Sequence, residues 1–331
     1  MSNLPATMRA LEQPALTGPQ DLRLRTDAPV PVPAEGEVLI RVGAAGVNFA
    51  DVMQTLGTYD GGPRAPYIAG FEAVGEVVAR GPGVTGVELG SHVIGTGPGA
   101  FAEYMVMPAT AAAPVPEGWT DEQALGLVLN WATALAALKP LGRLSRGETV
   151  LVHAAAGGVG QAAVRMAAHY GATVIATASP DKHDTVRALG AHHVLDYRSV
   201  DVAAEVARLT EGRGADLVLE SVGGDTFAAS LAATRRVTGR VVVYGAAAGR
   251  SVITNWDLNF RHQIHLIGLH IGVLIEHAPE IFGELMRELA ALRAAGVYPP
   301  GKPAVHDLAD GPAVLTALAE RTTIGKLALR P

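Results

Sequence analysis

A glycine-rich turn between a strand-like run and a helix-like run is the stretch of this chain best suited to hold a charged ligand. Six small residues, Ala155-Ala156-Gly157-Gly158-Val159-Gly160, join the strand-like residues 149–154 to a helix-like run. In a dinucleotide-binding turn, the second glycine lets backbone approach the pyrophosphate, and the third lets the helix pack closely on the strand. Gly157 and Gly160 stand at those places, while Ala155 replaces the first glycine. The spacing therefore predicts a turn that holds a dinucleotide at a helix N-terminus.

The end of the next apolar run bears on which dinucleotide is bound. About 20 residues after such a turn, proteins that bind NAD carry an Asp or Glu for the ribose 2′-hydroxyl. Here the run ends in Ser179 and Lys182, and Asp181 already belongs to the expected helix start. Ser179-Pro180-Asp181 is also an ordinary helix beginning, with an N-cap, a proline and a first-turn acid. A solvated surface lysine suits the 2′-phosphate of NADPH, so we expect NADPH as the cofactor.

Composition excludes several classes of protein. The chain has 331 residues, of which 49% are apolar and 18% charged, with a net charge of −6 and no cysteine. The acidic balance argues against nucleic acid or an anionic membrane as partner, and no apolar run reaches the ~20 residues of a membrane span. Without cysteine there is no disulfide, thiol nucleophile or cysteine-ligated metal. The first residues lack an export signal, so we expect a cytoplasmic protein.

Two patterns follow each other along the chain. The first part is rich in Gly and Pro, and its short strand-like runs indicate a compact, mostly antiparallel β unit. These runs are residues 37–42, 73–81, 91–95 and 102–107. Thr120 and Gln123 then have capping-box spacing before a long helix-like stretch. From Glu148 onward, strands alternate with helices up to a last apolar run at 264–271, which predicts a parallel, doubly wound sheet.

We therefore expect an α/β fold in two domains, the first of which is split. Residues 1–127 and a return segment, 273–331, are expected to form the β-rich domain, and residues 128–272 the Rossmann domain. The run 264–271 would be the last strand of the parallel sheet. Because an apolar strand at a sheet edge invites pairing with another chain, we expect a homodimer.

Several motifs resemble one family over nearly the whole chain. They are GAAGVNFADVMQTLGTY, GFEAVGEVVARGPGV, GAFAEYMV, HAAAGGVGQAAVRMA and the closing GKLAL. Together they resemble the zinc-free medium-chain dehydrogenases/reductases, and among these the NADPH:quinone oxidoreductases of the zeta-crystallin type. The resemblance implies a GroES-like catalytic domain beside the Rossmann domain, an active site in the cleft between them, and a dimer formed through the last strand.

At the positions where zinc-dependent members of the superfamily carry metal ligands, this chain has mostly other residues. Zinc alcohol dehydrogenases of the same superfamily carry a cysteine and a histidine where this chain has Asn48 and Phe71. Of the usual set only Glu72 remains, and one carboxylate does not hold a zinc ion. The histidines of RHQIHLIGLH (residues 261–270) lack a matching acid or thiolate. We therefore expect no metal site.

Further site residues are implied by the resemblance. Asn48, Tyr59 and Thr133 correspond to positions that line the nicotinamide and acceptor pocket. Asn48 would orient the nicotinamide or the acceptor oxygen, and Tyr59 would hydrogen-bond an oxyanion. Additional cofactor contacts are implied for Tyr197, Gly245 and Arg321. Structural alternatives remain open: Asn48 as a turn former, Asp51 as a helix cap, Tyr59 as a surface aromatic and Tyr197 as a packing residue.

The expected chemistry follows from a site without metal. Hydride addition to a simple ketone gives an alkoxide, which needs a Lewis acid or a strong donor. A quinone or enone gives a phenolate or enolate, and a phenolate is a far weaker base, with a pKa of about 10. We therefore expect an NADPH-dependent, metal-free reductase of quinones or α,β-unsaturated carbonyls. Two alternatives stay open: an enoyl-thioester reductase, and an NADPH-binding structural or RNA-binding protein with little turnover.

Overall fold

The computed structural model describes residues 4–331, which divide into two compact units. The β-rich unit comprises the described residues up to 128 together with 300–331, and the αβ unit comprises residues 129–299. The return to the first unit begins at residue 300, later than the expected 273. Packing inside the αβ unit explains the difference: α9 (Pro279–Ala294) lies against α3 (Ala132–Leu138), and Tyr298 stacks on Trp131 at 3.7 Å.

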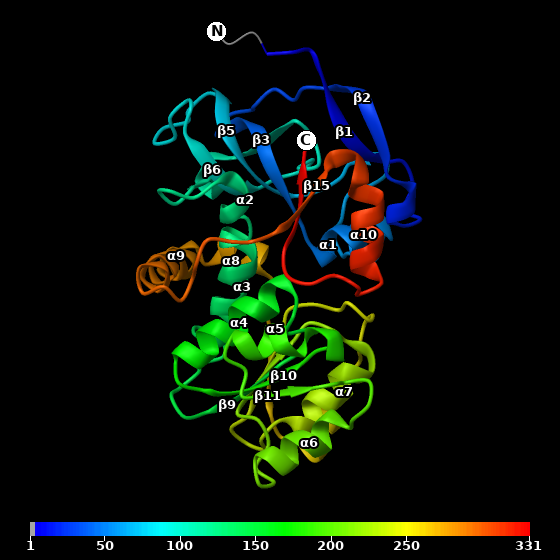
Figure 1. Cartoon of the computed structure of the whole chain (residues 1–331), viewed down its shortest axis with the longest axis vertical. Helices are drawn as coiled ribbons and strands as arrows, with labels where there is room; N and C mark the ends of the chain where they lie inside the picture. Colours follow the sequence, from blue (N-terminus) through cyan, green and yellow to red (C-terminus); the bar gives the residue numbers. More distant parts are fainter. Residues whose placement is uncertain (1–3) are drawn as a thin grey trace. The chain divides into compact units, whose positions relative to one another are not determined.

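Mostly antiparallel ladders build the β-rich unit (Figure 1). A small sheet joins β1 (Thr7–Gln13), β2 (Arg23–Pro29) and β4 (Tyr67–Ile68). The larger sheet contains β3 (Glu37–Val47), β5 (Glu72–Arg80), β6 (His92–Thr96), β7 (Tyr104–Pro108), β8 (Ala113–Pro114), β15 (Ala304–Asp307) and β16 (Leu327–Arg330). The helices of the β-rich unit are α1 (Phe49–Thr55), α2 (Asp121–Ala124) and α10 (Gly311–Ala319). Since β16 pairs antiparallel with β3, the C-terminal segment completes the sheet begun by the N-terminal part.

The register of the larger sheet brings distant residues to one place. Gly46 of β3 is paired with Glu72, the first residue of β5. Val47 is paired with Leu327, the first residue of β16. Asn48 directly follows β3 and Lys326 directly precedes β16. The ladder therefore sets Asn48, Glu72 and Lys326 side by side.

Among residues 129–299, six parallel strands form one sheet in the order β11-β10-β9-β12-β13-β14. The strands are β9 (Thr149–Val152), β10 (Thr173–Thr177), β11 (His193–Leu195), β12 (Leu217–Glu220), β13 (Arg240–Val243) and β14 (His265–Gly268). The connecting helices are α4 (Gly158–His169), α5 (His183–Ala188), α6 (Val202–Leu209) and α7 (Gly224–Ala233). Figure 1 shows α4 and α5 on one side of the sheet and α6 and α7 on the other. This strand order is that of doubly wound dinucleotide-binding folds, which confirms the predicted fold class.

Central strands of the parallel sheet are covered on both faces. Every residue of β9 and β12 is buried, as expected for strands that read as continuous apolar runs. The core beneath α6 and α7 includes Leu151, Ile175, Val206, Val218, Phe227, Leu231 and Val241. No helix of residues 4–331 combines the length and apolarity that a membrane crossing requires.

Two expected elements are interrupted. The capping box forms, with the Thr120 hydroxyl accepting from the Gln123 N–H and the Gln123 side chain accepting from the Thr120 N–H. The helix nevertheless ends at Ala124, because Gly126 adopts a φ of 89°. The last apolar run gives β14 only to Gly268. It then turns into α8 (Ile271–His277), which His270 caps by accepting the Val273 N–H.

Candidate active site

Glu72 is a fully buried carboxylate, and its partners define a charged network in the β-rich unit. Its Oε1 accepts the backbone N–H of Gly126 at 2.7 Å. Its Oε2 accepts from Nδ2 of Asn48 at 2.9 Å and from the ammonium of Lys326 at 2.5 Å. The Lys326 side chain is only 12% exposed. Because a buried charge is costly unless it is paired and hydrogen-bonded, these three partners stabilise the carboxylate in the interior.

The amide of Asn48 is oriented by this network. Its Nδ2 donates to the Gly46 carbonyl at 3.2 Å as well as to Glu72, and its Oδ1 accepts from Lys326 at 2.7 Å. A primary amide has two N–H donors, so both are engaged within the β-rich unit. The Glu72 carboxylate and the Lys326 ammonium together fix the orientation of the amide, with Nδ2 toward Glu72 and Oδ1 toward Lys326. The predicted contact of Asn48 with nicotinamide or acceptor stays a prediction.

Two glycines make room for the network. A Cβ at Gly46 would lie 2.3 Å from Oε2 of Glu72 and 3.0 Å from Cε of Lys326, so only hydrogen fits there. Gly126, with its positive φ, turns its N–H toward the carboxylate. The end of the helix at Ala124 thus leaves the Gly126 N–H available to the buried Glu72 carboxylate.

Asp51 adds a second buried carboxyl beside this network. It is 1% exposed, and its Oδ2 accepts the backbone N–H of Asn48 at 2.7 Å, which closes the capping box of α1. Burial raises the pKa of Asp51 to about 8, against a smaller lowering effect of the Lys326 charge. Burial, and then the Asp51 charge, raises the pKa of half-buried Tyr59 and raises that of Tyr67 to about 12. An acid and two phenols therefore share one electrostatic environment.

A zinc ion does not fit these residues. Zinc in proteins takes cysteine, histidine and carboxylate ligands, three or four at a time. Here the Glu72 carboxylate and the Asn48 amide are both engaged by the Lys326 ammonium, which already supplies positive charge. Within residues 4–331 no cluster of three His, Asp or Glu side chains has a metal-binding arrangement.

The glycine-rich turn of the αβ unit is built by close backbone packing. Gly157 is the N-cap of α4, and a Cβ at Gly160 would lie 2.3 Å from the carbonyl oxygen of Ala154. Ala154 itself has a φ of 48°, so the tight turn is made one residue before Ala155, which is fully buried. The open N-terminus of this twelve-residue helix can hold a phosphate by its free N–H groups.

Basic side chains gather after β10 and β11. Lys182 ends a 3-10 turn (Pro180–Lys182) and is 7% exposed, so the expectation of a solvated surface lysine is wrong. The Ser179 hydrogen bond, and more weakly the charges of Lys182 and Arg198, lower the pKa of Asp181. Arg198 lies over the Tyr197 ring, 5.5 Å from its centroid. The sequence reading missed Arg198, although it directly follows Tyr197.

The loops after β12 and β13 touch closely. Glu220 accepts the N–H groups of Val222 and Gly223 through one oxygen and the Ser230 hydroxyl through the other. A Cβ at Gly245 would lie 2.7 Å from the Ser221 carbonyl oxygen. Gly245, a predicted cofactor residue, is therefore required for this approach of two loops at the carboxyl ends of the strands, where dinucleotides bind in such sheets.

The remaining predicted residues belong to different units. Thr133 is buried on α3 of the αβ unit. Arg321 is exposed after α10 in the β-rich unit, with a φ of 62°. Asn48 and Tyr59 belong to the β-rich unit, whereas Ser179, Lys182 and Tyr197 follow the adjacent strands β10 and β11 of the αβ unit. The roles of all these residues stay predictions.

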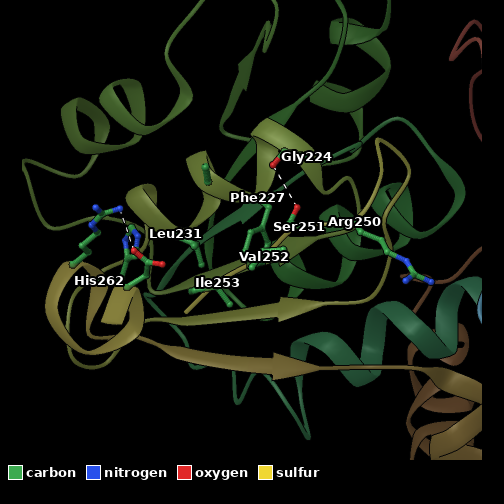
Figure 2. A pocket seen from close by; sticks show the side chains of 11 residues that line it. Gly224, Phe227, Leu231, Arg250, Ser251, Val252, Ile253 and His262 are labelled. Atoms are coloured by element: carbon green, nitrogen blue, oxygen red, sulfur yellow. Dashed lines mark hydrogen bonds and ion pairs between the residues drawn. The ribbon is translucent and has the colours of Figure 1, made fainter. Parts of the chain in front are cut away.

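Figure 2 shows a separate pocket of about 370 Å³ in the αβ unit. Phe227 and Leu231 of α7 form apolar lining together with Val252 and Ile253. Charged side chains of the segment 250–262 also line it, and Arg261 pairs with Asp257 at 3.1 Å. None of the predicted site residues lines this pocket.

Two family descriptions match the chain. Residues 34–117 match the alcohol dehydrogenase GroES-like domain, and residues 158–291 match zinc-binding dehydrogenase. Relatives include a mycocerosic acid synthase-like polyketide synthase of Mycobacterium tuberculosis (37% identical over 90% of this chain) and prostaglandin reductase-3 of Bos taurus (41% over 68%). The chain spans only 14% of the first and 59% of the second.

Solved structures are similar over nearly the whole chain. A mycobacterial protein complexed with NADPH is 34% identical, with a TM-score of 0.92 over 98% of this chain and 100% of that one. Escherichia coli quinone oxidoreductase complexed with NADPH is 30% identical, with a TM-score of 0.91 and the same coverage. The CurK enoyl reductase is 28% identical, with a TM-score of 0.88 over 98% and 99%. The chain therefore belongs to the medium-chain dehydrogenase/reductase family, as an oxidoreductase of its quinone oxidoreductase-like branch.

Proposed function

We propose that this oxidoreductase uses NADPH and transfers hydride to quinones or α,β-unsaturated carbonyls. The turn Ala155–Gly160 would hold the pyrophosphate, with Gly245 in the facing loop. Ser179, Lys182 and Arg198 would bind the 2′-phosphate beside Tyr197, and the resemblance adds Arg321 as a further phosphate contact. NADPH, when bound, supplies the hydride. Two similar proteins solved with NADPH support the choice of cofactor.

The Glu72 network is the observation that carries the choice of acceptor. Its cation, Lys326, is held by Asn48 and Glu72, and this donor set does not suit zinc. The product anion must then be stabilised by hydrogen-bond donors, which favours an acceptor whose anion is a weak base. Quinones and conjugated carbonyls meet that requirement, and Asn48, Tyr59 and Thr133 would line their pocket.

An enoyl-thioester reductase is the second candidate. The similarity to the CurK enoyl reductase and to polyketide synthases favours it. Its acceptor is also a conjugated carbonyl, so the same reasoning about the anion applies. What would distinguish it is recognition of the carrier's phosphate, which would need basic side chains at the mouth of the acceptor site.

A panel of acceptors tests the proposal. NADPH oxidation would be followed with a benzoquinone, an enal, an enone and an enoyl thioester. We expect the highest kcat/KM with the quinone or the enone. A clear preference for the thioester would support the second candidate, and binding of NADPH without turnover of any acceptor would favour a binding protein. Salt-dependent binding of RNA by that inactive protein would then identify the third alternative.

We further propose a cytoplasmic homodimer that pairs through β14. This strand ends the order of the parallel sheet and has partly exposed residues. Trp256 and Phe260 nearby are 61% and 58% exposed. Exposed sheet edges and aromatic side chains favour association. Light scattering that gives the mass of one chain at micromolar concentration would contradict the dimer.

A further inference from the structure

A connected series of buried polar side chains crosses the carboxyl ends of three neighbouring strands in the αβ unit. His153 directly follows β9, Thr177 is the last residue of β10, and Glu220 is the last residue of β12. Each of them is at most 2% exposed, and Ser230 of α7 is fully buried. Nδ1 of the imidazole lies 3.1 Å from the Thr177 hydroxyl and Nε2 lies 3.0 Å from the Ser230 hydroxyl. Since Ser230 also bonds the Glu220 carboxylate, the four side chains form one connection across the sheet.

The single proton of the Ser230 hydroxyl fixes the direction of these hydrogen bonds. Its oxygen has three neighbours, which are Nε2 of His153, the Glu220 carboxylate and the Thr226 carbonyl oxygen at 2.8 Å. The carboxylate, whose other oxygen accepts two backbone N–H groups, and the carbonyl both act as acceptors. Nε2 must therefore donate, and Nδ1 of the neutral ring accepts from Thr177. Burial, against a weaker opposing effect of the Glu220 charge, lowers the pKa of His153 and keeps the ring neutral.

At its Glu220 end, the network holds the turn 221–224 after β12. One carboxylate oxygen accepts the N–H of Val222 at 2.5 Å and that of Gly223 at 2.9 Å. Gly223 and Gly224 have φ values of 76° and 54°, and glycines have so much conformational freedom that a defined turn needs such an anchor. The Val222 carbonyl oxygen in turn accepts the Ala248 N–H at 2.5 Å. Glu220 therefore also fixes the loop after β13.

At its His153 end, the network belongs to the glycine-rich turn. His153 directly precedes Ala154, whose φ of 48° makes that turn tight, and the Thr177 carbonyl oxygen accepts the Ala155 N–H at 3.1 Å. The imidazole between Thr177 and Ser230 thus ties the glycine-rich turn to the turn 221–224. Dinucleotides lie across the carboxyl ends of such strands, where both turns are found. Because apolar side chains would fill this interior without the cost of burying polar groups, packing alone does not explain the network.

We propose that His153 is a positioning residue for NADPH, which acts through Ser230 and Glu220 to hold the glycine-rich turn and the turn 221–224 in register. This inference rests on the proposed placement of the cofactor along these two turns. Neither turn is the one assigned to the 2′-phosphate. His153 therefore supports the binding of NADPH and of NADH alike, whereas Lys182 distinguishes between them.

His153→Leu and His153→Gln test this role. Leucine fills the space but has no N–H group, whereas the side-chain amide of glutamine can still donate to Ser230. The Kd for each cofactor would be measured by fluorescence titration without any acceptor. In His153→Leu we expect both Kd values to rise by about tenfold, the equivalent of one hydrogen bond to a charged group, so that the preference for NADPH is unchanged. His153→Gln should recover most of the loss.

Thr210→Val is the matched control, because it removes another buried hydroxyl of the αβ unit. That hydroxyl accepts the Gly214 N–H at 2.9 Å in the loop before β12. The variant should lower the free energy of unfolding and leave both Kd values unchanged, as a purely structural hydrogen bond does.

If His153→Leu does not fold, Ser230→Ala cuts the same connection by the loss of one oxygen atom, and it should likewise raise both Kd values. Unchanged Kd values in the variant that folds overturn the positioning role, as does a changed preference between the two cofactors or an equal loss in His153→Leu and His153→Gln. A wild type that binds neither cofactor overturns the proposed function as well.

Discussion

The two candidate binding regions are built in opposite ways. In the αβ unit, small residues within one short segment hold the backbone in place, as the close approach of Gly160 to Ala154 illustrates. In the β-rich unit, charged side chains meet from far apart in the chain: Asn48 and Lys326 are separated by 278 residues. The first region should be sensitive to volume and the second to charge. Substitutions in either region can therefore test that difference.

Lys326→Met should have the largest effect. It removes the cation and leaves the fully buried Glu72 carboxylate with only its N–H donors. Removing one partner of a buried ion pair costs about 3–5 kcal/mol, which urea denaturation would detect. Lys302→Met is the control, because Lys302 is exposed in the same unit. Adding Glu72→Gln to Lys326→Met should recover part of the loss, and a double variant less stable than the single one would contradict a charge-based account.

Gly160→Ala should be the next largest. The new methyl would lie 2.3 Å from the Ala154 carbonyl oxygen and 2.6 Å from Cα of Ala155, so α4 must move away from β9. Overpacking of this kind costs about 1–3 kcal/mol, and the displaced helix end should raise the KM for NADPH. Gly283→Ala on α9 is the control, since its nearest neighbour would be 3.6 Å away. If the two variants had equal stability and equal KM for NADPH, the glycine-rich turn would not be sensitive to added side-chain volume.

Over a single pH unit, the smallest predicted effect is the change in stability that comes from Asp51. Burial raises the pKa of Asp51 from 3.8 to about 8, so the folded protein keeps a proton that the unfolded chain releases. Its contribution to the free energy of unfolding is complete below about pH 4 and decreases as pH rises toward 8, by up to about 1.4 kcal/mol per pH unit. Denaturation at several pH values should give wild type this extra slope relative to Asp51→Asn. Parallel curves would contradict it.

The αβ unit could be predicted from sequence because its signals are local. Alternating apolar runs specify the parallel sheet, and the turn residues Gly157 and Gly160 lie next to the strand that they connect. Where tertiary contacts determine the local structure, the expectation from sequence was wrong. Lys182 is buried although lysines usually lie at the surface, and the end of the last apolar run becomes α8.

The β-rich network could not be derived from local pattern. Family resemblance pointed to Asn48 and to an altered zinc position, but the pairing with Lys326 depends on the register of β16 against β3. Gly126 interrupts a stretch with good helix signals because its N–H is needed by Glu72. Such conflicts between local preference and overall fold occur most often at functional sites.

Cofactor discrimination tests the central claim most directly. The measurement is kcat/KM for NADPH and for NADH with one quinone, in the wild type and in Lys182→Ala. A hydrogen bond to a charged group contributes about 1.5–3 kcal/mol, so the wild type should prefer NADPH by about 10- to 150-fold. The variant should lose most of that preference while its kcat/KM with NADH stays nearly unchanged. Equal use of both cofactors by the wild type, or a variant that loses both alike, would contradict the assignment of this site to the 2′-phosphate.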